Sequence, residues 1–491
     1  MRPSFARIAV TVVIATAVTT VTSLGWAGSV SPQHAPIITL IGASDVHCGD
    51  FTEADASNTA KERDDIHKVA IQHAKNLAFG SKLALRLLFD AHRQHEAWLF
   101  TVGDNAAVTG RDTRASRDAR GRAHKDGITE FACTDQWHYL TPEDGLPAER
   151  RIWWNAPFPE APDRQVMEIT LPTIGNHERD ATWNAQGYFE AFGAQIDWLK
   201  HDEPRGPAKP SAVYETELGP RAYYAKLIGR HWLFLSLDST LGTTLRWPEK
   251  GIAATENSGP VAAVSPSPDP QTPCKGEIDR RASAPAELEI CGLKMMDVVK
   301  RAHGSLEPNH DEAGQAPWVA RQVAWAREHN RCVIAVWHHP TRTGDNSTQY
   351  DQGAMADIWS EIYGTAGLVV TGHAHWFEQE RLAGKDLSKR ATHGLLELNL
   401  AAAGGVPSKP HGMTTEMPAT EAFGSVKERN GVPIRSNKEI IGVLQLTLTD
   451  SSRPQAKWTF WGQETSEIEK GWDRAEAKRI EHGTFQCPPF P

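Results

Sequence analysis

Short apolar runs recur along the chain, and several end in a turn that carries polar side chains. The run at 36–44 predicts a buried strand that ends at Asp45 and His47. Apolar residues at helical spacing then predict a helix over 64–95 with a break near Gly80, followed by a strand over 97–102. A strand, a helix and a second strand in this order indicate a crossover between parallel strands.

The later part of the chain continues the pattern. Further strands are predicted over 166–174, 223–228, 232–237, 332–337 and 367–371, and helices over 183–199, 318–328 and 356–363. Gly229-Arg230 separates two of these strands, which predicts a hairpin. After residue 375 the runs alternate polar and apolar side chains, which predicts a second sheet packed on the first. These runs lie at 395–400, 441–448 and 457–461, and a charged helix or tail is expected over 470–482.

Two polar segments, 109–162 and 241–316, are too long to be simple connections inside a compact domain. We therefore expect one domain over 36–465 with insertions at 109–162 and 241–316, and a C-terminal tail over 466–491. The first residues are basic, an uncharged apolar run follows, and small residues end it at Ala27. This pattern predicts a signal peptide over 1–27 and a secreted or periplasmic protein, with an uncleaved membrane anchor as the alternative.

Composition narrows the class of protein. The 491 residues are 40% hydrophobic and 23% charged, as in ordinary globular proteins, and the net charge is -9. An acidic balance argues against nucleic acid as the main partner, and no stable membrane partner is expected if the N-terminal segment is removed. All six cysteines follow the N-terminal segment, and an even number in an exported protein permits disulfides. Cys274 and Cys291 flank one polar loop and form the first expected pair, while other pairings stay open.

Five polar blocks carry the candidate chemistry, and each follows a predicted strand. Carboxylate, amide and imidazole groups are ligands for hard and borderline metal ions, and a pair of ions needs one group that bridges them. Each block alone has an ordinary explanation as a turn, a helix cap or buried histidines, but the joint order is far more specific. The blocks are Ser44-Asp45-Val46-His47, Gly103-Asp104-Asn105, Gly175-Asn176-His177-Glu178, Trp337-His338-His339-Pro340 and Gly372-His373-Ala374-His375.

In this order the blocks resemble the calcineurin-like metallophosphoesterase superfamily. Residues 188–193, 237–239, 402–405 and 458–460 resemble its secreted acid-phosphatase-like branch. The resemblance implies an α/β fold, a four-layer α/β/β/α sandwich of two mixed β-sheets flanked by helices. It also implies an exported phosphoesterase that contains two divalent metal ions (Zn, Mn or Fe) and hydrolyses phosphomonoesters through a metal-bound hydroxide.

The resemblance assigns a role to each site residue. His177 is a catalytic residue beside the substrate phosphate and not a ligand, and Asp104 is the bridging, catalytic carboxylate. Asn176, His177 and His339 are the residues expected to face the substrate. The first ion would be held by Asp45, His47, Asp104 and His375, and the second by Asp104, Asn176, His338 and His373.

One departure from the resemblance bears on the metal. Purple acid phosphatases have a tyrosine ligand three residues after the bridging aspartate, where this chain has Ala107. We therefore expect a colourless protein without an iron–tyrosinate absorption band. Two alternatives stay open, which are a phosphodiesterase that uses the same site and a metal-dependent binding protein without turnover. A serine hydrolase is disfavoured because the chain has no Gly-x-Ser-x-Gly sequence.

Overall fold

The computed structural model describes eleven main stretches of the chain and six isolated positions. All of the described secondary structure belongs to the compact unit Pro36–Pro491. The described stretches are 35–47, 60–105, 156–178, 185–205, 220–241, 302–304, 313–340, 358–362, 365–382, 395–405 and 439–487, and the isolated positions are 289, 290, 293, 294, 355 and 407.

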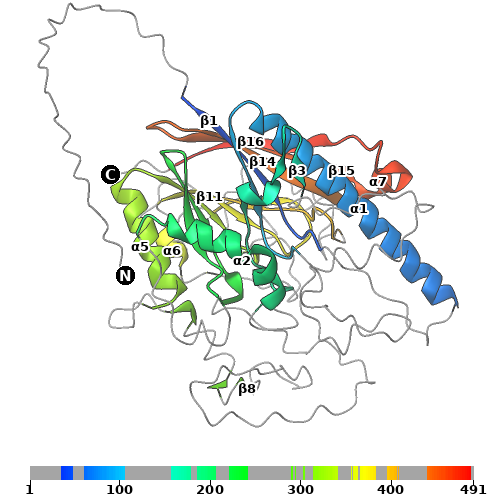
Figure 1. Cartoon of the computed structure of the whole chain (residues 1–491), viewed down its shortest axis with the longest axis horizontal. Coiled ribbons are helices and arrows are strands. Elements are labelled where there is room, and N and C mark those ends of the chain that lie inside the picture. Colours follow the sequence, from blue (N-terminus) through cyan, green and yellow to red (C-terminus); the bar gives the residue numbers. More distant parts are fainter. Residues whose placement is uncertain are drawn as a thin grey trace, which may run out of the picture. The chain divides into compact units, whose positions relative to one another are not determined.

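The first large sheet has six strands and combines both ends of the chain (Figure 1). β1, β2 and β5 run parallel to one another, whereas β14, β15 and β16 continue the sheet in antiparallel pairs. The order is β16 (Lys478–Gln486), β15 (Gln455–Glu464), β14 (Ile440–Thr449), β1 (Ile37–Ala43), β2 (Glu96–Thr101) and β5 (Thr170–Leu171).

The second large sheet also has six strands. Its four central strands are parallel, and an antiparallel strand closes each edge. The order is β12 (Glu378–Leu382), β13 (Leu395–Asn399), β11 (Ala366–Thr371), β10 (Cys332–Val336), β7 (Trp232–Ser236) and β6 (Tyr224–Ile228). Two small hairpins lie outside the sheets, β3 (Pro157–Phe158) with β4 (Ala161–Gln165) and β8 (Glu289–Ile290) with β9 (Leu293–Lys294).

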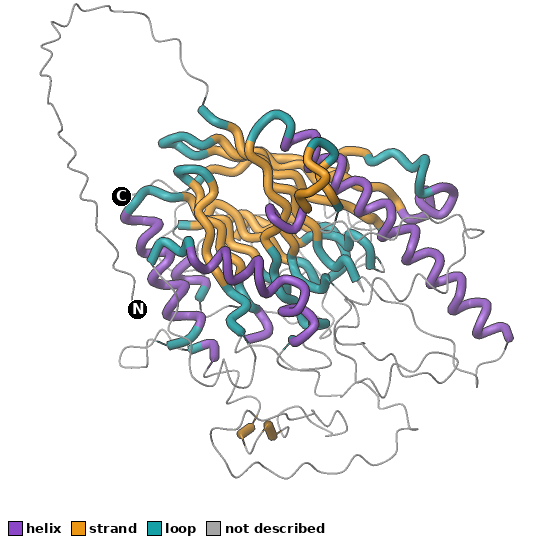
Figure 2. The backbone as a smooth tube through the Cα atoms, viewed as in Figure 1, coloured by secondary structure: helices purple, strands orange, loops and turns teal. Residues whose placement is uncertain are grey.

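Helices cover both outer faces of the sheets, as Figure 2 shows. α1 (Ala60–His92) packs on β1, β2 and β14, and α7 (Thr465–Gly471) packs on α1 and β15. α2 (Gln186–His201) packs on β6, and α5 (Gln315–Glu328) packs on β10 and on α6 (Trp359–Ile362). Short 3-10 turns occupy Val166–Ile169 and Ser239–Leu241. The architecture confirms the predicted α/β fold of two mixed sheets flanked by helices.

Apolar side chains hold the layers together. The ring centroids of Phe100 in β2 and Phe234 in β7 lie 5.7 Å apart across the interface between the sheets, and both side chains are fully buried. A second apolar cluster, which contains the buried residues Trp318 and Trp337, fills the space between α5 and the other face of the second sheet. The second sheet therefore has an apolar layer on both faces, which suits its near-continuous apolar central strands.

The structure corrects the predicted arrangement of the strands after residue 375. They do not form a sheet of their own, because β13 joins the second sheet and β14 and β15 extend the first. Each of the two sheets thus combines early and late strands. Sequence alternation predicts that a strand is half-buried but does not say which edge it joins.

The end of the chain also differs from prediction. Residues 470–482 were expected to form a charged helix or tail, but Lys478–Gln486 is an edge strand of the first sheet. A disulfide between Cys332 and Cys487, with a Cα–Cα distance of 5.6 Å, ties the end of this strand to the start of β10. The expected pair Cys274–Cys291 lies outside the described residues. Most side chains of β16 are charged or polar and only Phe485 is buried, which suits an edge strand with little buried surface.

Two local expectations were wrong. The predicted break near Gly80 is absent, since α1 is continuous, and a Cβ atom at Gly80 would overlap the Ala403 carbonyl. Gly80 therefore permits close packing of the helix on a loop rather than a break. The run predicted as a strand over 166–174 begins with a 3-10 turn over Val166–Ile169, and only Thr170–Leu171 pairs with β2.

Most of the two predicted insertions lies outside the described residues. The described parts are 156–162, which contains β3 and the start of β4, together with Leu241, the short strands β8 and β9, and residues 302–304 and 313–316. None of the described helices is both long and apolar enough to cross a membrane. The apolar run at 8–27, on which the signal-peptide prediction depends, is outside the described part of the chain.

Candidate metal centre

Parallel strands from both sheets deliver the five polar blocks to one place. β1 leads to Asp45 and His47, β2 to Asp104, and the segment after β5 to Asn176 and His177. From the second sheet, β10 leads to His338 and β11 to His373 and His375. The carboxyl ends of parallel strands share one edge of each sheet, so stacking the sheets brings the blocks together. The structure thus collects all of the residues predicted for the site.

The backbone at these blocks adopts a sparsely populated conformation. Eight non-glycine residues in the described part of the chain have positive φ, and five of them are site residues. Left-handed backbone costs a non-glycine residue about 1–2 kcal/mol and concentrates at functional sites. The five are Asp45 (φ 49°), His47 (47°), Asp104 (47°), His373 (67°) and His375 (62°).

Glycines allow the blocks to approach one another. Gly103 has φ 83°, and a Cβ atom there would lie 2.7 Å from the ring of His338. A Cβ atom at Gly175 would overlap the carboxylate of Asp104. These two positions therefore require glycine, one for its backbone conformation and one for space.

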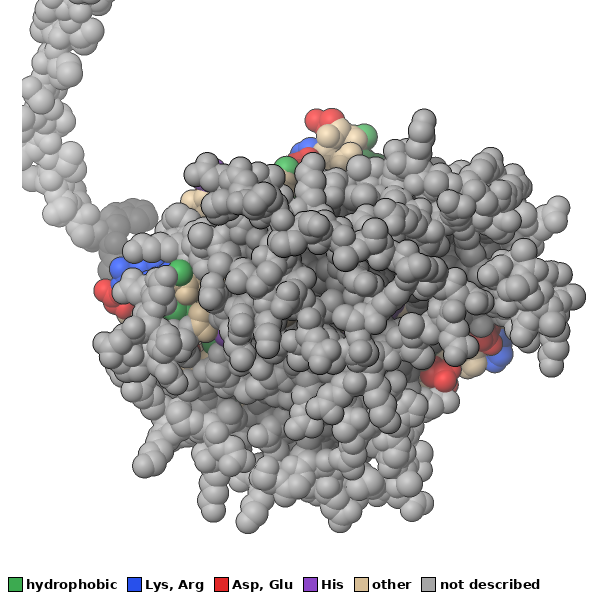
Figure 3. Space-filling view, turned by 90° about the horizontal axis from the view of Figure 1, so that it is seen from below, with side chains coloured by type: hydrophobic (Ala, Val, Ile, Leu, Met, Phe, Trp, Pro, Cys, Tyr) green, Lys and Arg blue, Asp and Glu red, His purple; other side chains and the backbone are tan. Residues whose placement is uncertain are grey.

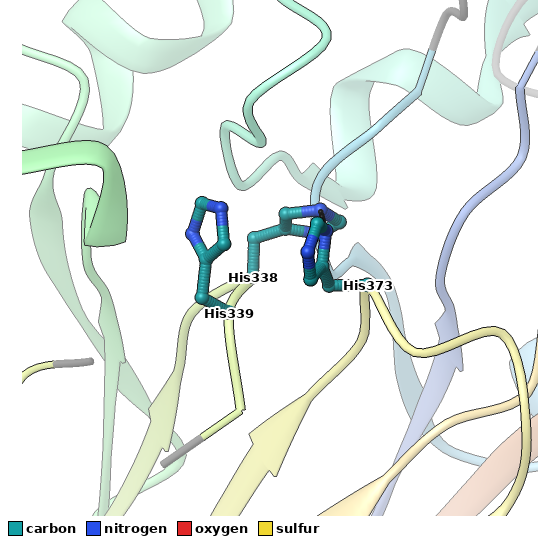
Figure 4. Close-up of side chains that lie close together, drawn as sticks. All are labelled: His338, His339 and His373. Carbon is teal, nitrogen blue, oxygen red and sulfur yellow. Dashed lines mark hydrogen bonds between the residues drawn. The ribbon is translucent and has the colours of Figure 1, made fainter. Parts of the chain in front are cut away.

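His338 is the centre of the first group of ligand atoms, and it is fully buried. Its Nδ1 lies 2.8 Å from the carbonyl oxygen of Val102, which can only accept a hydrogen bond, so Nδ1 carries a proton. Its Nε2 then faces three acceptor atoms, Asp104 Oδ2 at 2.9 Å, Asn176 Oδ1 at 3.0 Å and His373 Nδ1 at 3.2 Å. Figure 4 shows the rings of His338 and His373 close together. We call Asn176, His338 and His373 the His338 half-site.

The second group of ligand atoms is more widely spaced. His375 Nε2 lies 3.3 Å from Asp45 Oδ1, and His47 Nε2 lies 3.8 Å from the same oxygen. The His47 and His375 rings meet edge to face with centroids 4.7 Å apart. One ligand atom from each of the three residues falls within 4.8 Å of the others. We call Asp45, His47 and His375 the His375 half-site.

Asp104 links the two half-sites through a single oxygen. Its Oδ1 accepts the backbone N–H of His177 at 3.0 Å. Its Oδ2 faces His338 Nε2 at 2.9 Å and His47 Nε2 at 3.6 Å. The resemblance implies that Asp104 is a bridging carboxylate, and Oδ2 is the oxygen that faces both half-sites.

The chemistry of the atoms fits two divalent cations. Several lone pairs converge around Asp104 Oδ2 from both half-sites, which is unfavourable unless a proton or a cation lies among them. Nitrogen from imidazole and oxygen from carboxylate and amide suit zinc, manganese and iron. The bond from His338 Nδ1 to a carbonyl is the arrangement that orients metal-binding histidines. The assignment of each residue as a ligand stays a prediction.

Burial and neighbouring charge set the protonation of the site. Burial raises the pKa of Asp104, but the charge of His338 outweighs this and holds it well below its usual range. Burial lowers the pKa of His338, but the charge of Asp104 more than offsets burial and raises it to about 9. Burial and the charge of His338 lower the pKa of His373 to about 3. For His339, burial followed by the charges of His373 and His338 lowers the pKa well below its usual range.

Glu178 is a structural residue whose role the sequence analysis missed. It is fully buried, and its carboxylate accepts backbone N–H groups from Asp104 (3.1 Å), Asn105 (2.6 Å) and Gly175 (2.6 Å). These bonds tie the loop after β2 to the loop that carries Asn176. The sequence did indicate Glu178, because it is the last residue of the third polar block. A carboxylate that is buried there needs hydrogen-bond donors around it.

His177 and His339 lie beside the half-sites in different surroundings. The His177 side chain is 32% exposed, its Nε2 is 3.8 Å from Asp104 Oδ2, and its ring centroid is 4.8 Å from that of His47. His339 is buried, and its ring centroid is 4.6 Å from that of His373. Figure 4 shows its ring to one side of the His338 and His373 rings. Ala107, on which the prediction of a colourless protein rests, is outside the described residues.

Comparison with known proteins finds no protein-family profile and no curated protein sequence that matches this chain. Three solved structures are similar over 92% of the chain. One is described as "GAP50 the anchor in the inner membrane complex of Plasmodium" (10% identity, TM-score 0.40, 89% of that chain). The others are PhoD (12%, 0.43, 70%) and a dimetal phosphatase from Danio rerio (10%, 0.37, 99%). At these identities and TM-scores the likeness says nothing of function, which has to be inferred from the site itself.

Proposed function

We propose that this chain is a phosphoesterase that binds two divalent cations and hydrolyses phosphomonoesters outside the cytoplasm. The observation that carries the proposal is the position of Asp104 Oδ2, which faces His338 Nε2 at 2.9 Å and His47 Nε2 at 3.6 Å. A shared carboxylate between two sets of nitrogen and oxygen ligands is what a two-cation site for phosphoryl transfer requires. When bound, the cations would supply Lewis acidity and lower the pKa of water.

The chain's own residues would prepare the site in three ways. Asp104, fixed through Oδ1 by the His177 backbone, would keep Oδ2 between the two half-sites. His177, the more exposed group, would reach the substrate and donate a proton to the leaving oxygen. Glu178 would hold both loops in register, so that the ligand atoms need little rearrangement on binding.

Two observations support the location and the partner. The Cys332–Cys487 disulfide is typical of oxidising compartments, which supports export through the N-terminal segment. A net charge of -9 supports a small phosphate ester rather than nucleic acid as the ligand. In the space-filling view of Figure 3, acidic and basic side chains of the described residues lie beside one another.

The test is a paired hydrolysis assay. The mature protein is stripped with a chelator, reloaded with zinc, manganese or iron, and given p-nitrophenyl phosphate or its bis-ester. Metal-dependent turnover of the monoester, lost in Asn176→Ala and His177→Ala, supports the proposal. Preference for the bis-ester would replace it with a phosphodiesterase that uses the same site. Binding of two ions without turnover of either ester would replace it with a binding protein.

A further inference from the structure

His339 lies next to the His338 half-site, yet its firmest contact is with a serine from another strand end. Ser239 Oγ is 2.8 Å from His339 Nδ1, and the backbone N–H of His339 donates to the same oxygen at 3.0 Å. Ser239 is fully buried and His339 is 3% exposed. The serine follows β7, so the contact joins two neighbouring loops of the second sheet.

This pair of contacts favours one of the two neutral tautomers of His339. A serine hydroxyl has one proton to donate, and leaving a buried donor unused is costly. Within the described part of the chain, His339 Nδ1 is the acceptor that faces the Ser239 hydroxyl, whose lone pair already receives the backbone N–H. This arrangement favours donation from the hydroxyl to Nδ1, and an imidazole that accepts at Nδ1 has its proton on Nε2.

The serine itself is held rigidly. The Gln315 side chain accepts the backbone N–H of Asp238 at 2.7 Å and donates to its carbonyl oxygen at 3.0 Å. The Asp238 carboxylate accepts the backbone N–H of Thr240 at 3.0 Å. All of these groups are buried. Fixed neighbours on both sides keep the Ser239 hydroxyl in one place, as an oriented site requires.

The same geometry decides between two roles for His339. One nitrogen from each of His338, His339 and His373 falls within 4.8 Å of the others, so the three could be interpreted as ligands of one cation. A ligand must offer a lone pair, whereas in the favoured tautomer Nε2 of His339 presents an N–H. The ring centroid of His339 is 4.6 Å from that of His373 and 5.0 Å from that of His338, so the ring lies beside the atoms that would hold a cation there.

We propose that Ser239 is a positioning residue that fixes His339 as a neutral Nε2–H donor, and that this N–H binds a phosphoryl oxygen of the substrate. The inference rests on the proposed function and deepens it, because it adds a substrate contact that is not a metal ligand and assigns the residue that orients it.

The first experiment measures binding of inorganic phosphate to the two-cation protein by calorimetry. In His339→Gln the side-chain amide nitrogen replaces Nε2, whereas in His339→Asn it replaces Nδ1. We expect His339→Ala and His339→Asn to weaken phosphate binding by about 10- to 100-fold, with most of the affinity restored in His339→Gln. Every variant should retain two cations per chain. His329→Gln, in an exposed histidine at the end of α5, is the matched control.

Three results would overturn the inference: loss of one cation in His339→Ala, equal affinity in the Asn and Gln variants, or no phosphate binding to the loaded wild type. Ester hydrolysis is measured in parallel. If the loaded wild type hydrolyses no ester but the phosphate series behaves as expected, the proposed function fails and the phosphate contact stands.

A double-mutant cycle tests the role of Ser239. Ser239→Ala should weaken phosphate binding when His339 is present, because the imidazole then loses its fixed tautomer. It should have little further effect in the His339→Gln background, which has no nitrogen at Nδ1 for the hydroxyl to hold. A merely structural role for Ser239 would give the same loss in both backgrounds, and that result would overturn the assignment.

Discussion

The two half-sites share Asp104 but differ in how closely their atoms approach. Around His338, Nε2 lies 2.9–3.2 Å from three acceptor atoms. In the His375 half-site, Asp45 Oδ1 lies 3.3 Å from His375 Nε2 and 3.8 Å from His47 Nε2. His47 Nε2 also lies 3.6 Å from Asp104 Oδ2. Atoms at hydrogen-bond distance can share a proton, whereas atoms further apart do so poorly. A proton therefore competes with the cation mainly at the His338 half-site.

The largest effect is expected from a substitution of Asp104, the carboxylate that the two half-sites share. Asp104→Asn keeps the shape of the side chain but replaces an anionic oxygen that faces both half-sites. We expect hydrolysis to fall by more than about a thousandfold and bound metal to fall below two ions per chain. Metal analysis and steady-state kinetics measure both. Asp197→Asn, in an exposed residue of α2, is the control, and a fully loaded Asp104→Asn protein would contradict the bridging role.

A smaller loss of hydrolysis is expected on substitution of His177, which is predicted to act in the reaction without binding a metal ion. His177→Ala removes a half-buried imidazole next to His47. We expect kcat to fall by about 10²- to 10⁴-fold, which is the usual contribution of a general acid, while both half-sites keep their cations. Kinetics and metal analysis on the same preparation check this. Loss of metal from the His375 half-site alone would show that His177 is a ligand there.

Proton competition distinguishes the half-sites directly. In the metal-free protein burial lowers the pKa of His338, but the charge of Asp104 outweighs it and the pKa is about 9, so the ring is charged at pH 7. Because the folded pKa lies above the usual value near ~6.5, this proton stabilises the metal-free fold fully below about pH 6.5. That contribution is lost as pH rises through about 9.

A cation at His338 Nε2 must displace this proton, so its apparent affinity should rise about tenfold per pH unit from pH 6.5 to 9. Calorimetry at pH 7 in two buffers with different ionisation enthalpies counts the protons released. We expect the release of close to one proton for each cation that binds at the His338 half-site. In His338→Ala this proton release should be absent. Equal proton release from both half-sites would contradict the comparison.

The smallest effect on activity is expected from removal of the disulfide at the end of the strands that lies opposite the site. The Cys332–Cys487 bridge spans a sequence separation of 155 residues and joins the last strand to β10 at its start, away from the ligands. Replacing both cysteines with serine should lower the free energy of unfolding by about 2–5 kcal/mol. Denaturant unfolding measures the loss. Hydrolysis at 25 °C should not change, and a large drop would show that the two ends are coupled.

The sequence predicted which residues lie close together, because polar residues come directly after apolar runs. Val333 to Val336 and Leu368 to Val370 are buried strands, and residues immediately after a parallel strand must lie at its carboxyl end. His338 and His373 could therefore be placed near each other without a structure. The left-handed backbone at Asp45 and Asp104 gave no such signal, since it results from contacts made only after folding.

Long-range pairing could not be predicted in the same way. β12 has the sequence Glu-Gln-Glu-Arg-Leu, which is charged and has little strand character, and it forms because β13 offers an antiparallel edge. The pairing of β14 with β1 joins residues about 400 positions apart, and local alternation contains no information on it. The roles of Glu178 and Ser239 also depend on side chains that face them from other loops.

The most direct test of two half-sites around Asp104 is anomalous diffraction from zinc-loaded crystals. The account predicts two peaks about 3.5–4 Å apart, one beside His338 and His373 and the other beside His47 and His375. Asp104 Oδ2 should lie between them. A single peak among His338, His339 and His373, with none beside His375, would contradict it.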